Sequence, residues 1–312
     1  MNGLLLSKEY YSNVAEPKLK QEFPELYPRL AAGLVGNGSE CFGFDDDISR
    51  DHDWGIDFFI WTIDDDKDSI NSLGKWKSEL LRSNPPKHQR TRSEYGARVS
   101  VMTCAEFYTS LIGSTCTPKT QNEFLRVPEE NFAMSVNGGV FYDGAGEFTR
   151  VRSDLLRYLP EDIRRKRIAA KCMALAQTGQ YNYSRTAKRS DWVTLRTVLS
   201  RFTDSAIAMV FLLNKVYRPY YKWAYRAMKE LPLLGAVAAK LLLQIAEISN
   251  YDETSQKKHE ECISQLCGLF ATELKIQGLS QSNDWFLTSH GEDVRSGISD
   301  DFLRSLPAQY EI

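Results

Sequence analysis

The sequence predicts an α+β protein in which a domain built on a mixed sheet with flanking helices is followed by an all-helical bundle. Apolar runs of strand length alternate with helical segments up to residue 158. From residue 161 onward, apolar residues recur almost only at helical spacing. A chain of 312 residues is long enough for two ordinary domains. We therefore expect an α+β domain over residues 1–158 and a helical bundle over residues 159–312.

Local signals place the elements of the first domain. Residues 3–32 are predicted to be helical, with breaks or starts at Pro17, Pro24 and Pro28. Apolar and β-branched runs bounded by turn residues predict the strands. The expected strands are 31–35, 54–63, 96–103 and 139–142, and the expected helices are 68–82 and 105–112.

The second domain is predicted from helical periodicity alone, and short connections favour an up-and-down bundle. The expected helices are 161–178, 191–216, 220–229, 233–249 and 253–277, with a short one near 300–305. The apolar run Leu231–Ala246 contains Lys240 and is shorter than the roughly 20 residues that span a bilayer. We expect it to be a buried helix and expect no membrane partner.

Charge and cysteine content narrow the class of protein. A net charge of −2 disfavours a general nucleic-acid binder, which is usually basic. The six cysteines include no CxxC pair, which favours reduced, buried thiols in a cytoplasmic protein. The N-terminal MNGLLLSKEYY does not have the features of a signal peptide. The sequence leaves open whether the chain is a monomer or a homodimer.

The stretch Gly36–Gly55 carries the candidate site. Gly38 and Ser39 follow the first apolar strand, and Asp51 and Asp53 come twelve and fourteen residues after Ser39. Alternation along a strand would send both aspartates to one face, where a hard cation such as Mg²⁺ or Mn²⁺ would relieve their repulsion. Glycine lets a phosphate approach the backbone, and the serine hydroxyl donates to it. The pattern predicts a site for a metal-bound nucleoside triphosphate.

This arrangement resembles the nucleotidyltransferase superfamily, which includes polymerase beta, kanamycin nucleotidyltransferase and the streptomycin adenylyltransferases. The segment SRDHDWG is similar to an uncharacterised bacterial family within it, a domain of unknown function. Three later segments extend this resemblance over most of residues 30–225: Gly138–Thr149, Gly179–Arg189 and Leu213–Trp223.

The resemblance implies that Asp51 and Asp53 hold two metal ions for transfer of a nucleoside monophosphate from an NTP to a hydroxyl, with release of pyrophosphate. The acceptor is expected to be a small molecule, less readily a protein. The alternative is a catalytically degenerate protein that binds a nucleotide or a partner without turnover.

The superfamily adds a third acid on the next strand, but residues 97–103 contain none, and Ser100 stands at a fitting position. Asp143, at the end of the fourth strand, is the first candidate to replace it as a catalytic residue, although a turn role in Tyr142–Gly144 competes. Alternatively Asp47 or Glu40, in the loop between the Gly-Ser pair and the aspartate pair, could supply the missing carboxylate.

Several cations are candidates for binding the nucleotide. Arg50 adjoins the aspartate pair, whereas Arg185 and Arg189 are four residues apart and expected on one helix face, after the aromatic Tyr181–Tyr183. Lys222 lies among tyrosines and Trp223. We expect the nucleotide in a cleft between the domains, with one or more of these side chains facing it.

Two further charged features are expected to be structural. His52 alternates with the two aspartates and is expected to form a structural hydrogen bond. The basic run 164–167 begins a helix and is expected to form a solvated face.

Overall fold

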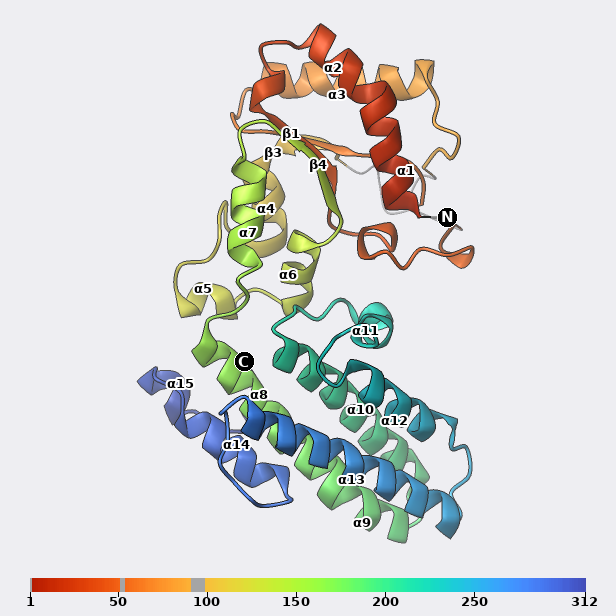
Figure 1. Cartoon of the computed structure of the whole chain (residues 1–312), viewed down its shortest axis with the longest axis vertical. Coiled ribbons are helices and arrows are strands. Elements are labelled where there is room, and N and C mark those ends of the chain that lie inside the picture. The colour runs from red at the N-terminus through yellow and green to blue at the C-terminus, as the bar shows by residue number, and fades with distance from the viewer. Residues whose placement is uncertain (1, 51–53, 91–98) are drawn as a thin grey trace. The chain divides into compact units, whose positions relative to one another are not determined.

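The computed structural model describes residues 2–50, 54–90 and 99–312 (Figure 1). The chain forms two compact units, Met1–Arg157 and Tyr158–Ile312, and the boundary expected from the sequence lies one residue later. Unit 1 contains a four-stranded mixed sheet with helices, and unit 2 is helical. The predicted α+β class with a following helical region is confirmed.

Unit 1 contains four strands, seven α-helices and short 3₁₀ or π turns in its described residues. The strands are β1 (Leu30–Leu34), β2 (Phe59–Thr62), β3 (Val101–Thr103) and β4 (Gly139–Asp143). The helices are α1 (Gly3–Tyr10), α2 (Glu16–Glu22), α3 (Lys67–Ser83), α4 (Cys104–Ile112), α5 (Gln121–Leu125), α6 (Glu129–Val136) and α7 (Glu147–Leu155). A π-helical turn (Tyr11–Ala15) joins α1 to α2, and 3₁₀ turns cover Tyr27–Arg29, Glu40–Phe42 and Ile48–Arg50.

Strand pairing brings four chain segments to one edge of the sheet. The strand order is β3-β2-β1-β4, in which β1 is antiparallel to β2 and β4 while β3 is parallel to β2. Gly33 pairs with Phe59, and Leu34 pairs with Gly139. The C-terminal end of β1 therefore shares an edge with the starts of β2, β3 and β4.

Alternate residues of the strands face two helical layers. Leu30, Ala32 and Ile60 belong to a core with residues of α1, α2 and α3. On the other face, the Trp61 ring stacks on Phe148 of α7 with 4.0 Å between centroids and contacts Phe107 of α4. The sheet thus lies between a layer formed by α1, α2 and α3 and a layer that contains α4 and α7, as Figure 1 shows.

Short polar signals set where the helices begin. The Thr103 hydroxyl accepts a hydrogen bond from the Glu106 amide, while the Glu106 carboxylate accepts one from the Thr103 amide, so α4 starts directly after β3. The Asp66 side chain caps α3 by accepting a hydrogen bond from the Asp68 amide.

Several sequence expectations for unit 1 need correction. The third strand was expected over residues 96–103, but in the described part of the chain it begins only at Val101. The second strand was expected over residues 54–63 but begins only at Phe59. Residues 54–58 are buried, so an apolar run was mistaken for a longer strand. Helices α5, α6 and α7 were not predicted; they have five, eight and nine residues, which is too short for a sustained periodic pattern.

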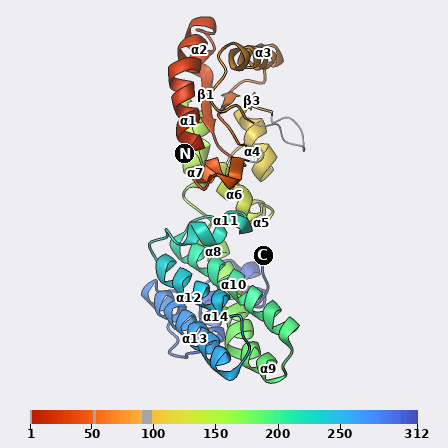
Figure 2. The same ribbon diagram turned by 90° about the vertical axis from the view of Figure 1, so that its right-hand side faces the viewer.

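Unit 2 is a bundle whose helices lie side by side (Figure 2). Its described elements are α8 (Glu161–Leu175), α9 (Tyr183–Lys188), α10 (Trp192–Asn214), α11 (Tyr221–Met228), α12 (Gly235–Glu247), α13 (Glu253–Ile276), α14 (Leu287–Ser296) and α15 (Asp301–Ser305). A π-helical stretch, Ala176–Asn182, joins α8 to α9. Helix α14 was not expected from the polar sequence after residue 280. It nevertheless packs along α8.

The basic run at the start of α8 is buried, which corrects the expectation of a solvated face. The exposed fractions of Arg164, Lys166 and Arg167 are 2%, 0% and 8%. The Arg164 guanidinium donates to the Leu212 carbonyl at 2.8 Å, and the Lys166 ammonium donates to the carbonyls of Pro307 and Ala308 at 2.5 and 3.2 Å. Backbone carbonyls of unit 2 thus accept hydrogen bonds from the buried Arg164 and Lys166.

The cysteines are free thiols, as expected, and five of the six are buried. Burial raises the pKa of the Cys104 thiol to about 12, and the same holds for Cys267. Both therefore stay protonated at neutral pH. Within the described residues, none of the helices combines the length and apolar character needed to cross a membrane.

Candidate functional site

The Gly-Ser turn lies at the sheet edge where β1 ends. Gly36 and Gly38 have φ values of +110° and +126°, a region that favours glycine. A Cβ on Gly38 would lie 2.5 Å from the Glu40 carboxylate, so no larger residue fits there without rearrangement. Ser39 is half-buried and precedes the 3₁₀ turn Glu40–Phe42. No acceptor for the Gly38 or Ser39 amide is found among the described residues.

Residues just before β4 clamp this turn. The Gly36 amide donates to Asn137 Oδ1, and the Asn137 Nδ2 group donates to the Gly36 carbonyl, both at 2.8 Å. The Gly138 amide donates to the Cys41 carbonyl at 2.7 Å. Consecutive residues of one segment therefore hold both ends of the turn.

Asp51, Asp53, His52 and the side chain of Arg50 lie outside the described residues. The chain is described again from Trp54, whose side chain is 5% exposed and whose Nε1 donates to Asp45 Oδ2 at 3.1 Å. The same carboxylate oxygen accepts from the Gly3 amide at 2.8 Å. Trp54 is thereby fixed at the start of residues 54–58, the buried approach to β2.

Two acids near this edge already have cationic partners. Glu40 is 1% exposed, and its carboxylate lies 2.9 Å from the Arg90 guanidinium. Asp57 lies 2.6 Å from the Lys77 ammonium. The described residues contain no group of three or more His, Cys, Asp or Glu that could hold a metal ion.

Ser100, the residue at the expected third-acid position, directly precedes β3. Its carbonyl accepts from the Ile60 amide at 2.8 Å, which places it at the same sheet edge as the Gly-Ser turn. It also lines an open groove of about 610 Å³ with residues of α3, among them Gly74, Ser78 and Arg82. No acidic side chain takes its place in the described part of this strand.

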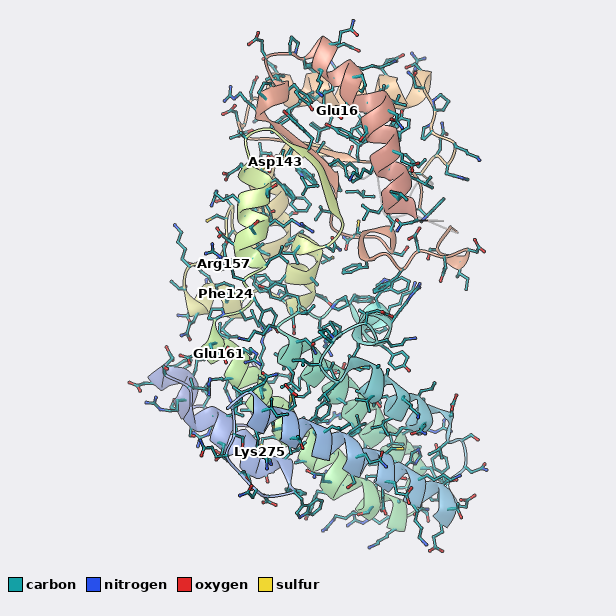
Figure 3. The ribbon with its side chains drawn as sticks, in the orientation of Figure 1. Glu16, Phe124, Asp143, Arg157, Glu161 and Lys275 are labelled. Carbon is teal, nitrogen blue, oxygen red and sulfur yellow. The ribbon has the colours of Figure 1, made fainter. Side chains whose placement is uncertain are left out.

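Asp143 lies at the opposite edge of the sheet, where β4 meets α7 (Figure 3). It pairs with Ala31 at the start of β1, so four residue steps separate it from Gly139, roughly 13 Å at about 3.3 Å each. Its carboxylate accepts from the Gly146 amide at 2.9 Å and the Thr149 amide at 2.7 Å. The register supports the turn role of Asp143 and not its recruitment as a third ligand.

The three cations expected to bind nucleotide from unit 2 do not lie together. Arg185 is on α9, and Arg189 directly follows that helix, whereas Lys222 is on α11. These elements lie at opposite ends of α10, whose 23 residues span about 34 Å (Figures 1 and 2). One nucleotide site cannot include both groups.

The local contacts of these residues also differ from expectation. The Arg185 guanidinium stacks on the exposed Tyr181 ring, 4.7 Å from its centroid. Tyr183 is fully buried, and its hydroxyl lies 2.8 Å from His259 Nδ1, so it is not available to stack on a base. Lys222 lies 5.0 Å from the centroid of Trp223.

Comparison with known proteins gives one family match. The model of a domain of unknown function, DUF4037, matches residues 124–224. The match includes the segments Gly138–Thr149, Gly179–Arg189 and Leu213–Trp223, and it does not include the Gly-Ser turn or the aspartate pair. No curated protein and no solved structure matches the chain.

The sequence did not indicate the residues that hold the turn. Asn137 and Gly138 form an Asn-Gly dipeptide, which signals a turn before β4 but not a contact with Gly36, about a hundred residues earlier. Arg90 and Lys77 read as ordinary surface cations by sequence, yet both contact buried carboxylates. Only the strand pairing brings these residues together.

Proposed function

We propose that the chain binds a Mg²⁺-nucleoside triphosphate at the Gly36–Ser39 turn and transfers its nucleoside monophosphate to a hydroxyl of a small-molecule acceptor. The observation that carries the proposal is the pairing register, Gly33 with Phe59 and Ile60 with Val101. It brings the Gly-Ser turn, the approach to β2 that follows Asp53, and Ser100 to one sheet edge. This shared edge supports a site of the kind that the resemblance to nucleotidyltransferases implies.

The residues present have separable roles in this proposal. The Gly38 backbone and the Ser39 hydroxyl are available to phosphate oxygens, since glycine permits close approach and the hydroxyl donates. Asp51 and Asp53 are the proposed metal ligands. A bound divalent cation would offset the charge of the triphosphate and of the leaving pyrophosphate.

A second candidate is nucleotide binding without turnover. It is favoured by the acids at this edge, because Glu40 and Asp57 already contact Arg90 and Lys77, Ser100 is not an acid, and Asp143 lies at the other edge. With Asp51 and Asp53 as its two carboxylate ligands, the site would hold a second metal ion poorly.

Calorimetric titration with ATP and Mg²⁺ tests the proposal. Asp51→Asn and Asp53→Asn should each weaken binding at least about tenfold, a loss of about 1.4 kcal/mol or more. Asp65→Asn, the same change at an exposed aspartate, should bind as the wild type does. Unchanged affinity in both site variants would refute the metal-dependent site.

An assay of pyrophosphate release with a panel of hydroxyl-bearing small molecules then separates the two candidates. Release that depends on both acceptor and Asp51 supports transfer. If Asp51→Asn abolishes nucleotide binding but the wild type releases no pyrophosphate from any nucleotide, the result supports nucleotide binding without turnover.

A further inference from the structure

The conformation of the Gly-Ser turn depends on one side chain from a distant part of the chain. Asn137 follows α6, and its carboxamide both accepts from the Gly36 amide and donates to the Gly36 carbonyl, each at 2.8 Å. A carboxamide presents an acceptor and a donor side by side, which matches the two polar groups of one backbone residue. Asn137 therefore fixes both polar groups of the residue where the turn begins.

The neighbouring residue fixes the other end. The Gly138 amide donates to the Cys41 carbonyl at 2.7 Å, just beyond Ser39. A Cβ on Gly138 would lie 2.0 Å from the Leu34 carbonyl oxygen, so this close approach to the end of β1 requires glycine. Residues 137 and 138 thus enclose the segment 37–40 between two anchored ends.

The anchoring segment is itself held by α7. Arg152 donates from one guanidinium nitrogen to the Val136 carbonyl at 2.7 Å, with longer contacts to the carbonyls of Asn137 and Gly138 at 3.3 and 3.4 Å. Burial lowers the pKa of this guanidinium. An arginine side chain nevertheless keeps its charge in proteins. A cation directed at three consecutive carbonyls restrains the backbone that carries Asn137.

We propose that Asn137 is the positioning residue of the phosphate-binding turn, which presets the Gly38 amide and the Ser39 hydroxyl for a nucleoside triphosphate. The inference rests on the proposed function of this turn. Donors that are already oriented bind a phosphate without first losing conformational freedom, so their preorganisation contributes to affinity. In this proposal Asn137 orients the turn without contacting the nucleotide. Its loss should therefore weaken nucleotide binding, and not only slow the transfer step.

The test compares two asparagines near one helix. Asn137→Asp keeps the acceptor for the Gly36 amide but places a carboxylate oxygen against the Gly36 carbonyl. Asn131→Asp is the matched control, because Asn131 of α6 donates its carboxamide to the Leu111 carbonyl at 2.7 Å, away from the turn. Asn137→Ser, whose short hydroxyl cannot reach both groups, serves if the aspartate variant does not fold.

Two measurements are made on each folded variant: affinity for Mg²⁺-ATP by calorimetry and amide hydrogen exchange of residues 36–41. We expect Asn137→Asp to weaken binding about tenfold and to speed exchange in this segment, while Asn131→Asp changes neither. Asn137→Gln should not preserve affinity or slow exchange, because its extra methylene moves the carboxamide away from the polar groups of Gly36.

The outcomes separate this inference from the function on which it rests. If the wild type binds Mg²⁺-ATP and Asn137→Asp binds it equally well, Asn137 is not a positioning residue. If the wild type binds no Mg²⁺-ATP, the proposed function is refuted. In that case amide exchange still tests the contact itself: unchanged exchange of residues 36–41 in Asn137→Asp would show that Asn137 does not hold the turn. If Asn131→Asp weakens binding as much, general destabilisation explains the effect and the inference is refuted.

Discussion

The Lys77 ammonium lies 2.6 Å from the Asp57 carboxylate, and both side chains are nearly excluded from solvent. Lys77 comes from α3 and Asp57 from the approach to β2. The same ammonium donates to the Phe58 carbonyl at 2.5 Å. This ion pair therefore ties α3 to the stretch that leads from the aspartate pair into the sheet.

Breaking this ion pair on one side should be costly. Lys77→Met leaves a buried carboxylate without its cation, and the loss of a partner from a buried pair costs about 3–5 kcal/mol. The free energy of unfolding in urea measures it. The double variant Lys77→Met, Asp57→Leu should recover a large part of that loss, because no lone charge remains buried. If the double variant is as unstable as Lys77→Met, the pair is not the cause.

Replacing Gly38 by alanine should disrupt the turn. Its φ of +126° disfavours a side chain, and the new Cβ would lie 2.5 Å from the Glu40 carboxylate. We expect a loss of stability of more than about 1 kcal/mol and weaker binding of Mg²⁺-ATP. Thermal unfolding and calorimetry measure these two effects.

Gly74→Ala is the matched control for that change. Gly74 is inside α3, and a Cβ there meets no atom within 4 Å. Alanine in a helix interior should stabilise the protein by about 0.5–1 kcal/mol relative to glycine. If Gly38→Ala were as stable as Gly74→Ala and bound nucleotide normally, the turn would tolerate a side chain at residue 38. The conformation of the turn would then not require glycine there.

The sequence predicted the layout of the fold because its signals are local. The first strand and α3 were placed to within about a residue of the observed β1 (Leu30–Leu34) and Lys67–Ser83, since the apolar pattern marks them. The approach to β2, residues 54–58, was misassigned as strand because its apolar residues are buried without belonging to β2. Short helices such as α6 have too few residues for a periodic pattern.

The candidate site could be predicted only in part. The Gly-Ser turn was located by its residues, but its anchor Asn137 depends on a tertiary contact that no local pattern encodes. Asp143 was a reasonable ligand candidate until the antiparallel register of β4 placed it at the far edge. The burial of Lys166 was missed for a similar reason, because its carbonyl partners come from the C-terminal segment.

Lys166 should anchor that C-terminal segment to α8. Its buried ammonium donates to the carbonyls of Pro307 and Ala308, and replacing it by methionine leaves both without this donor. We expect a loss of about 1–3 kcal/mol and faster amide exchange over residues 308–312, with α10 unaffected. Exchange measured by mass spectrometry locates the effect.

The control is Lys257→Met, which removes an exposed lysine of α13 that pairs with Glu253 at 2.8 Å. Solvent screens an exposed ion pair of this kind, so stability and exchange should change little. Exchange in residues 308–312 that is equally slow in Lys166→Met and the wild type would show that the segment is held by other contacts.

His259 should make the stability of the protein depend on pH. The ring is 1% exposed, its Nε2 donates to the Ile245 carbonyl at 3.1 Å, and its Nδ1 accepts from the Tyr183 hydroxyl at 2.8 Å. This pairing requires the neutral ring, since Nδ1 accepts a proton donor. Burial lowers the pKa of His259 below its usual value of 6.5.

The sign of the effect follows from proton binding. Between the lowered pKa of the folded state and 6.5, the unfolded chain binds a proton at this residue that the folded chain does not. The free energy of unfolding should therefore fall as the pH drops below 6.5 and level off below the folded-state pKa. His259→Gln cannot titrate, so its unfolding free energy should depend less on pH over this range. Urea unfolding of both proteins from pH 8 to pH 5 measures the difference, in which the contributions of other titrating groups cancel. Parallel curves for the two proteins would show that His259 does not change its protonation on unfolding.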